Sequence, residues 1–158
     1  MQILGIDPGL ERIGYGLVSR EGSRLACVAH GLLSTPPGPL PERLLRIHTE
    51  MRDLLVRLKP DAVAAERLLF ATNRTTAMDV SRATGVVLLA VAEAGLPWTE
   101  YSPPEIKLAV VGHGGAEKKQ VGFMVTRLLS LDKLPKPDDV ADALAVAICH
   151  ALKSNLAR

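Results

Sequence analysis

The chain has 158 residues, of which 47% are hydrophobic and 23% charged, and this length and composition suit one globular domain, spanning residues 1–158, with one core. The formal net charge is only +2, so charge alone does not predict a polyanionic partner. No apolar run has the length of a membrane helix and no basic-then-apolar leader opens the chain, so we expect a cytoplasmic protein without a membrane partner. Cys27 and Cys149 are expected to be buried thiols.

The first predicted element is a short apolar strand. Residues 3–7 are dense enough in apolar and small side chains to predict a strand buried on both faces, which Pro8 and Gly9 end. Two more strands are predicted at residues 13–19, where two glycines weaken the pattern, and at 25–33, so that the three form an antiparallel meander. Asp7 is left at the end of a central strand, where a carboxylate is costly unless a cation meets it.

Helices and strands alternate through the rest of the chain. The apolar periodicity of residues 41–59 predicts a helix that crosses over to a fourth strand at residues 61–66. If that strand lies parallel to the first, Glu66 reaches the same edge of the sheet as Asp7. Further elements are predicted as a helix at 74–94, a strand at 97–101, and helices at 103–111, 116–129 and 138–153. This order predicts an α/β fold, with a five-stranded mixed sheet and helices on both faces.

The last predicted helix carries acidic residues at its start. Every residue from 140 to 149 except Asp142 is apolar, which predicts a buried helix. Asp139 and Asp142 are three residues apart and therefore share one face of the first turn. Asp138 suits the N-cap position, and Asp139 would also be favoured there by the helix dipole. Asp142 would be a poor capping-box residue, so we favour a functional role for it.

Four carboxylates are therefore expected to converge. Asp7 and Glu66 each end an apolar strand, and the helix that starts near residue 138 supplies Asp139 and Asp142. Without a cation these groups would repel one another and some of their pKa values would rise. Mg²⁺ takes oxygen ligands and keeps positions open for water and phosphate oxygens, and two such ions can activate a water and stabilise the leaving oxygen of a phosphodiester. The set predicts metal-dependent phosphodiester chemistry.

Several motifs spread along the chain carry a resemblance to a known family. They are residues 3–9 with Gly14-Tyr15-Gly16, Ala65-Glu66, residues 105–107, residues 110–118 and residues 139–145. Together they resemble the RuvC family of Holliday junction resolvases over essentially the whole chain. The resemblance implies a ribonuclease H-like fold, a homodimer, and an endonuclease that makes paired nicks in four-way DNA junctions. It also implies dependence on Mg²⁺, with two ions in each site and Mn²⁺ as a substitute.

The resemblance implies roles for individual residues. Four acids match the family's catalytic carboxylates and are expected to bind the metal: Asp7, Glu66, Asp139 and Asp142. Two lysines match residues that the family places near the scissile phosphate, Lys107 and Lys118. In some relatives His takes the place of Asp139. Lys119 and Arg74 are further candidate DNA contacts. Relatives place an aromatic side chain three residues after the second acid, where this chain has Leu69, followed by Phe70; Phe70 is a candidate for stacking on a base or for a core position.

The resemblance also implies protein partners. Residues 74–94 match the helix through which the family dimerises, and their small apolar side chains suit close packing, although one face of this helix is expected to be core. The family implies contact with the RuvA–RuvB branch-migration complex.

Three alternative functions fit parts of the same pattern. An actin-like or sugar-kinase-like ATP-binding domain also has an Asp-x-Gly strand end, but such enzymes need a second domain. A non-catalytic junction-binding protein would leave four clustered acids to repel DNA. A shorter family of resolvase-like proteins shares the opening strand, and the surroundings of Lys107 and Lys118 favour the RuvC family over it.

Overall fold

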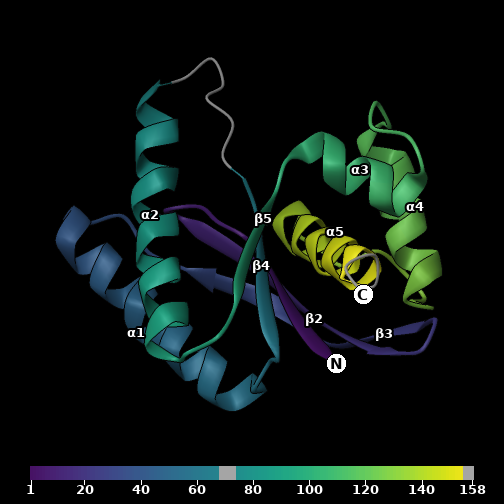
Figure 1. Ribbon diagram of the computed structural model, residues 1–158. Coiled ribbons are helices and arrows are strands. Elements are labelled where there is room, and N and C mark those ends of the chain that lie inside the picture. Colours follow the sequence, from purple (N-terminus) through teal and green to yellow (C-terminus); the bar gives the residue numbers. More distant parts are fainter. Residues whose placement is uncertain (68–73, 155–158) are drawn as a thin grey trace.

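The computed structural model describes residues 1–67 and 74–154, which form a sheet flanked by helices (Figure 1). The strands are β1 (Gln2–Asp7), β2 (Arg12–Glu21), β3 (Arg24–Ser34), β4 (Ala62–Glu66) and β5 (Trp98–Tyr101). The helices are α1 (Leu40–Leu58), α2 (Arg74–Glu93), α3 (Pro103–Val111), α4 (Lys118–Leu128) and α5 (Asp138–Lys153). Every predicted element is present, and its ends differ from the prediction by no more than two residues. None of these helices, over the residues described, is long and apolar enough to cross a membrane.

β1 lies at the centre of the sheet, whose strand order is β3-β2-β1-β4-β5. β2 is antiparallel to both β1 and β3, and β4 is parallel to both β1 and β5. The predicted meander and the predicted parallel crossover are therefore confirmed. Because Ile6 pairs with Ala65, the residues that follow them, Asp7 and Glu66, end neighbouring strands at the same edge.

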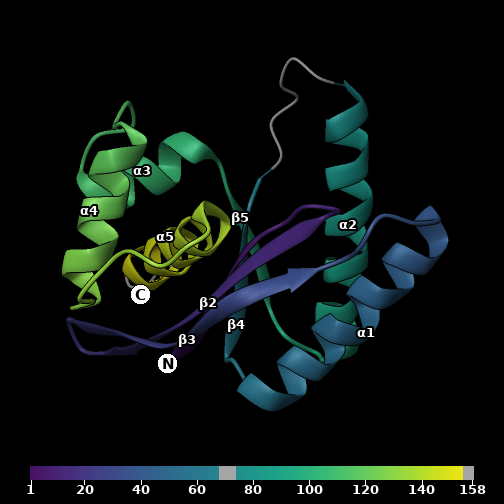
Figure 2. The ribbon, with the colours of Figure 1, turned by 180° about the vertical axis from the view of Figure 1, so that it is seen from behind.

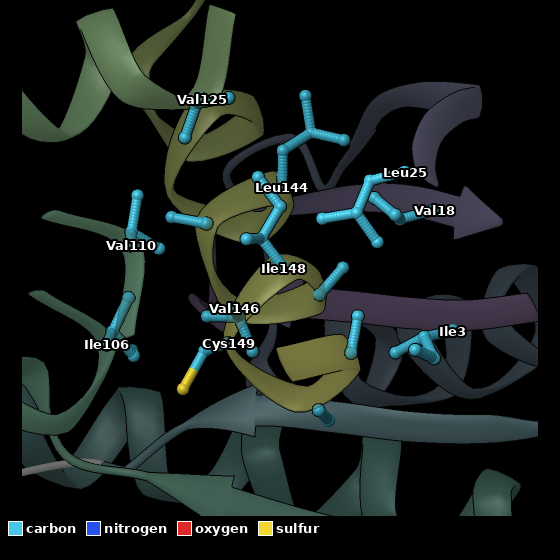
Figure 3. Close-up of a cluster of buried hydrophobic side chains, with 14 of the residues drawn as sticks. Ile3, Val18, Leu25, Ile106, Val110, Val125, Leu144, Val146, Ile148 and Cys149 are labelled. Carbon is cyan, nitrogen blue, oxygen red and sulfur yellow. The ribbon is translucent and has the colours of Figure 1, made fainter. Parts of the chain in front are cut away.

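Helices cover both faces of the sheet, as predicted (Figures 1 and 2). α1 and α2 lie on one face, where they bury Leu4 and Ile6 of β1. α5 lies on the other face, and α3 and α4 pack against α5. Figure 3 shows this second core, in which Leu144 and Ile148 of α5 lie against the strands. Ile3 belongs to the core around α5 and Leu4 to the core around α1, because side chains alternate along a strand.

α5 is buried nearly all round because it lies between the sheet and two helices. From residue 140 to residue 149 only Asp142 is less than fully buried, which confirms the prediction of a buried helix. A carboxylate inside such an apolar segment needs a polar partner or a cation. The position of α5 therefore brings Asp142 to the end of the sheet where β1 and β4 stop.

Glycines on β1 and β2 allow α5 to lie close to the sheet. Gly5 pairs with Gly16 in the β1–β2 register, and Gly14 pairs with Asp7. A Cβ atom on Gly5 would overlap the carbonyl oxygen of Ala143, and one on Gly14 would overlap the carbonyl oxygen of Asp139. The glycines that weaken the predicted second strand are thus part of the surface on which α5 rests. Larger residues there would move the start of α5 away from Asp7.

Two details differ from the predictions. The predicted N-cap role of Asp138 is wrong, because Pro137 with extended backbone occupies that position and Asp138 is the first residue of α5. The carboxylate of Asp138 lies 3.3 Å from Lys118 Nζ instead. Cys149 is buried as predicted, but Cys27 is only half-buried because β3 is an edge strand with incomplete cover. Both cysteines are free thiols.

We predict that Gly14→Ala destabilises the protein. The added methyl group would meet backbone atoms of Asp139 and Val140, which cannot move without shifting α5. Overpacking of this kind costs about 1–3 kcal/mol, which urea denaturation would detect. Gly38→Ala is the matched control, because a Cβ atom at Gly38 meets nothing within 4 Å. Equal stability of the two variants would show that α5 does not depend on the glycine surface.

Candidate active site

The four predicted acids come from two strand ends and one helix start. Asp7 ends β1 and Glu66 ends β4, while Asp139 and Asp142 lie in the first turns of α5. The backbone of Asp139 rests on Gly14, the register partner of Asp7, which brings the helix start to the strand end. The negative charges of the other three acids act on Asp7 directly. The four acids therefore lie near the same end of the sheet, and their joint binding of a metal ion stays a prediction.

Burial and mutual repulsion make ionisation of the carboxyl groups at this site unfavourable. Burial is the largest cause that raises the pKa of Asp7 to about 7, followed by the charges of Glu66, Asp142 and Asp139, while Lys118 opposes the rise. The pKa of Glu66 is also raised, first by burial and then by Asp142. Two adjoining carboxyl groups that resist ionisation are what a cation-binding or proton-transferring site provides.

Two basic side chains partly compensate the acids. Lys118 Nζ lies 3.0 Å from Asp142 Oδ2 and 3.3 Å from Asp138 Oδ2. Burial lowers the pKa of Lys118, but the hydrogen bonds and charges of these two acids outweigh that effect and the pKa is raised. Arg12 Nη2 lies 3.3 Å from Asp139 Oδ2. Asp139 and Asp142 therefore have different cationic partners, although they share the start of one helix.

A cavity of about 210 Å³ opens beside the acids, among α3, α4 and α5. Glu66 and Asp142 line it together with the two predicted catalytic lysines, Lys107 of α3 and Lys118 of α4. Asp139 instead lines a separate cavity of about 300 Å³ that includes Arg12. Carboxylates facing lysines across a cavity can bind a metal ion on one side and phosphate oxygens on the other.

A hydrogen-bonded group at the start of α3 holds the helix that carries Lys107. The backbone N–H and the hydroxyl of Ser102 each donate to Glu105 Oε2 at 2.9 Å. Lys153 Nζ, in the last turn of α5, donates to Glu105 Oε1 at 2.8 Å and lies 4.9 Å from the ring centroid of Tyr101. The bond from Lys153, followed by those from Ser102, lowers the pKa of Glu105 to about 2. These contacts tie α3 to α5 two residues before Lys107.

The donor set suits a hard divalent cation, but the acids are not gathered as ligands around one point. Within residues 1–67 and 74–154, no three His, Cys, Asp or Glu side chains are grouped closely enough to hold a metal ion. The reason is visible in the ion pairs, since Asp142 is turned to Lys118 and Asp139 to Arg12. A cation beside Asp7 would therefore compete with Lys118 for Asp142. Because the Lys118 side chain is 61% exposed, its ion pair with Asp142 is weak, and carboxylate oxygens suit the competing cation.

Of the three further predicted DNA contacts, only the side chain of Lys119 lies within the described part of the chain. Lys119 is exposed and lines a groove on α4 that also includes Phe123, whereas Lys118 lines the cavity beside Asp142. Phe70 lies outside the described residues, as does the side chain of Arg74. The roles of these three residues stay predictions.

Arg12 is a site residue that the sequence pattern did not identify. It lies two residues before Gly14 on β2 and faces α5 like that glycine, which is why it meets Asp139. Arg12, Gly14 and Gly16 alternate along β2 and therefore share one face of the strand. The lack of large apolar side chains at these three positions could have indicated that a helix start packs there.

Comparisons with known proteins agree with this geometry. Residues 3–150 match the family described as Crossover junction endodeoxyribonuclease RuvC. The chain is 51% identical over 152 residues to the protein of that name from Chloroflexus aggregans, covering 96% of this chain and 93% of that protein. It is 38% identical to Thermus thermophilus RuvC, with a TM-score of 0.93 and coverage of 99% and 97% of the two chains. The structure of T. thermophilus RuvC with a Holliday junction substrate gives 38% identity, a TM-score of 0.95, and coverage of 99% and 96%.

These matches extend over nearly the whole chain and confirm the predicted ribonuclease H-like fold. They also decide against the ATP-binding domain and the shorter resolvase-like family that fitted the opening strand. Four acids lie near one end of the sheet, and two lysines line a cavity beside two of these acids. This geometry agrees with the family match and the sequence identity, and the chain belongs to the RuvC family of crossover junction endodeoxyribonucleases.

Proposed function

We propose that this protein is a Holliday junction-resolving endonuclease, which cuts four-way DNA junctions by paired nicks during recombination and repair. The observation that carries the proposal is the cavity in which Glu66 and Asp142 face Lys107 and Lys118 next to the half-buried Asp7. It is supported by the T. thermophilus relative, which is described in complex with a Holliday junction substrate. We infer that residues 1–158 act as one nuclease domain, and that the protein acts in the cytoplasm, where its DNA substrate lies.

The acids are proposed to hold Mg²⁺, with two ions in each site and Mn²⁺ as a substitute. Asp7, between β2 and β4, would be the central ligand, and Glu66, Asp142 and Asp139 would complete the set. Bound there, the metal would lower the pKa of an attacking water and stabilise the leaving oxygen of the phosphodiester. The rigid strand ends fix the positions of Asp7 and Glu66 before any ligand arrives.

The two lysines are proposed to bind the phosphate that is cut. Lys118 is held by Asp142 and Asp138, so a metal ion that takes Asp142 as a ligand would release the ammonium group toward a phosphate oxygen. Lys107 lies across the same cavity on α3, whose start is tied to α5 by Glu105 and Lys153. Both ammonium groups thereby offset the negative charge of DNA close to the acids.

A homodimer through α2 is proposed because resolution needs two cuts in opposed strands. Met78, Leu88 and Leu89 of α2 are 57%, 39% and 53% exposed, which is unusual for large apolar side chains. A Cβ atom at Gly85 would meet nothing within 4 Å, so a second helix could approach there. A two-fold dimer would hold two identical sites at a fixed separation.

The remaining DNA and protein contacts are proposed from the family resemblance. Lys119, Phe70 and Arg74 are proposed as DNA contacts, of which Phe70 would stack on a base. Contact with the RuvA–RuvB complex is proposed on the same basis.

The proposed function predicts cleavage that depends on junction geometry, metal and Asp7. The wild-type protein with Mg²⁺ should cut a synthetic four-way junction at paired positions, and it should spare a linear duplex of the same sequence. EDTA should stop cleavage. Asp7→Asn should bind the junction with unchanged affinity and cut it at least about a hundredfold more slowly, because the central metal ligand is lost. Gel electrophoresis of end-labelled junctions and duplexes measures cleavage, and a native gel measures junction binding by Asp7→Asn.

Different results would count against separate parts of the proposal. Cleavage by Asp7→Asn at the wild-type rate would remove Asp7 from the metal site. Unpaired single nicks would contradict the dimer. Equal cutting of linear duplex would contradict junction selectivity.

The raised pKa of Asp7 predicts a pH dependence of stability in the metal-free protein. From about pH 4 to pH 7 the folded protein keeps a proton on Asp7 that the unfolded chain has released, so stability falls as the pH rises through this range. Asp7→Asn removes that loss. In EDTA its Tm should therefore exceed the wild-type Tm by more at pH 8 than at pH 5, corresponding to an added stability on the order of 3 kcal/mol. Asp132→Asn, which alters an exposed loop acid, is the control. A Tm difference independent of pH would show that Asp7 ionises normally.

Lys118→Ala should separate catalysis from folding. The Lys118 side chain is 61% exposed, so its loss should change the Tm little. Junction cleavage should slow by about a hundredfold or more, because a charge next to the phosphate disappears. Lys133→Ala removes an exposed lysine from the loop before α5 and should leave both quantities unchanged. An unfolded Lys118→Ala protein would mean that the lysine is structural, and normal cleavage would mean that it does not contact the phosphate.

A further inference from the structure

A second groove lies on the outer side of α3 and α4. Its volume is about 320 Å³ and it is lined by Val111, Lys119, Gln120, Phe123 and Met124. The Phe123 side chain is 60% exposed, and Leu108, which lies one turn before Val111 on α3, is 58% exposed. Two large apolar side chains are therefore presented to solvent beside a concave apolar surface. Such a surface is typical of an interaction site rather than of a free helix face.

Basic residues stand on both sides of the exposed aromatic ring. One stripe along α4 is formed by residues spaced four apart, Lys119, Phe123 and Arg127. The guanidinium carbon of Arg127 lies 5.4 Å from the centroid of the Phe123 ring. All three side chains are exposed, and neither cation forms a salt bridge within the described parts of the chain. The stripe thus offers an apolar anchor point with positive charge at each end.

The chemistry of the groove favours a polypeptide over DNA. A phosphate backbone is held by clustered cations and polar donors, and here Val111, Phe123 and Met124 dominate the lining. The proposed phosphate-binding lysines, Lys107 and Lys118, line the other cavity. Burying an exposed aromatic ring against apolar side chains is a main source of affinity in protein interfaces, and flanking charges select the partner's sign.

The location of the groove also argues against a second copy of this chain. Figures 1 and 2 show α2 beyond one face of the sheet and α4 beyond the other, with α5 and the sheet between them. The dimer proposed above uses α2 and would leave the outer side of α4 uncovered. The groove therefore remains available to a different protein in the proposed dimer.

We propose that this groove binds an acidic segment of another protein, which inserts an apolar side chain beside Phe123 and places carboxylates against Lys119 and Arg127. The binding site lies on the outer side of α4, while Lys118 faces the catalytic cavity. The proposal concerns recruitment and does not require the groove to take part in cleavage.

A peptide selection tests this proposal on the full-length protein. A phage-displayed library of random dodecapeptides is panned against the immobilised wild-type protein and, in parallel, against Phe123→Ser. The wild-type protein should enrich peptides that combine net negative charge with an aromatic or aliphatic residue, and Phe123→Ser should not. The best peptide, labelled with fluorescein, should bind wild type with at least about tenfold higher affinity than Phe123→Ser or Leu108→Ser in fluorescence anisotropy.

Charge and position are tested with further variants. Arg127→Glu should weaken peptide binding at low salt, and the difference from wild type should shrink as salt is added, because the attraction is electrostatic. Val56→Ser, which alters a 74% exposed apolar residue of α1, should bind the peptide like wild type. Phe123→Ser should keep the wild-type Tm, dimeric state and junction cleavage, so a failure of this proposal is distinguishable from a failure of the proposed nuclease function.

Specific outcomes would overturn the proposal. The first is a selection without acidic peptides, and the second is a peptide that binds Phe123→Ser and Leu108→Ser as tightly as wild type. Weaker junction binding by Phe123→Ser would assign the groove to DNA, and a monomeric Phe123→Ser protein would assign it to the dimer.

Discussion

The close approach of α5 to β1 and β2 is the contact on which the rest of the site depends. An ordinary side chain at Gly5 or Gly14 would overlap the backbone of α5, so the helix can lie at its observed distance only over glycine. This contact places the helix start, with Asp139 and Asp142, beside the end of β1. The same contact closes the core on that face of the sheet, since α5 contributes more of its buried apolar side chains than any other element does. Packing of the core and placement of the acids therefore rely on one interface.

Stability and function oppose each other at the end of that interface. The apolar surroundings that bury α5 also partly bury Asp7 near three other acids, and its pKa rises to about 7 as a result. Lys118 and Arg12 relieve part of the repulsion through ion pairs with Asp142 and Asp139. Both cations have exposed side chains, so these pairs contribute little to stability and exchange easily for other partners. The ion pairs reduce the repulsion among the acids in the folded protein, and a ligand that binds the acids more strongly than these side chains can replace them.

Much of the fold and part of the site followed from local patterns in the sequence. The apolar runs of β1 and α5 and the crossover between β1 and β4 were sufficient to predict that Asp7 and Glu66 share an edge. Contacts between distant segments were not predictable in this way. The pairing of Arg12 with Asp139 depends on the β1–β2 register and on the height of α5 above it. The N-cap assignment failed for Asp138 because both it and Pro137 suit a helix start, and only the backbone shows which one precedes the first turn.

The order of the elements along the chain has a consequence during synthesis. β1 and β4 are complete after residue 66, but α5, with Asp139 and Asp142, begins only at residue 138. A growing chain that has not yet released α5 from the ribosome lacks half of the acids and leaves one face of the sheet bare. Completion of the core and assembly of the four acids therefore occur in the same late step. A nascent or truncated chain without this helix would lack the largest contributor to one core and two of the four proposed metal ligands.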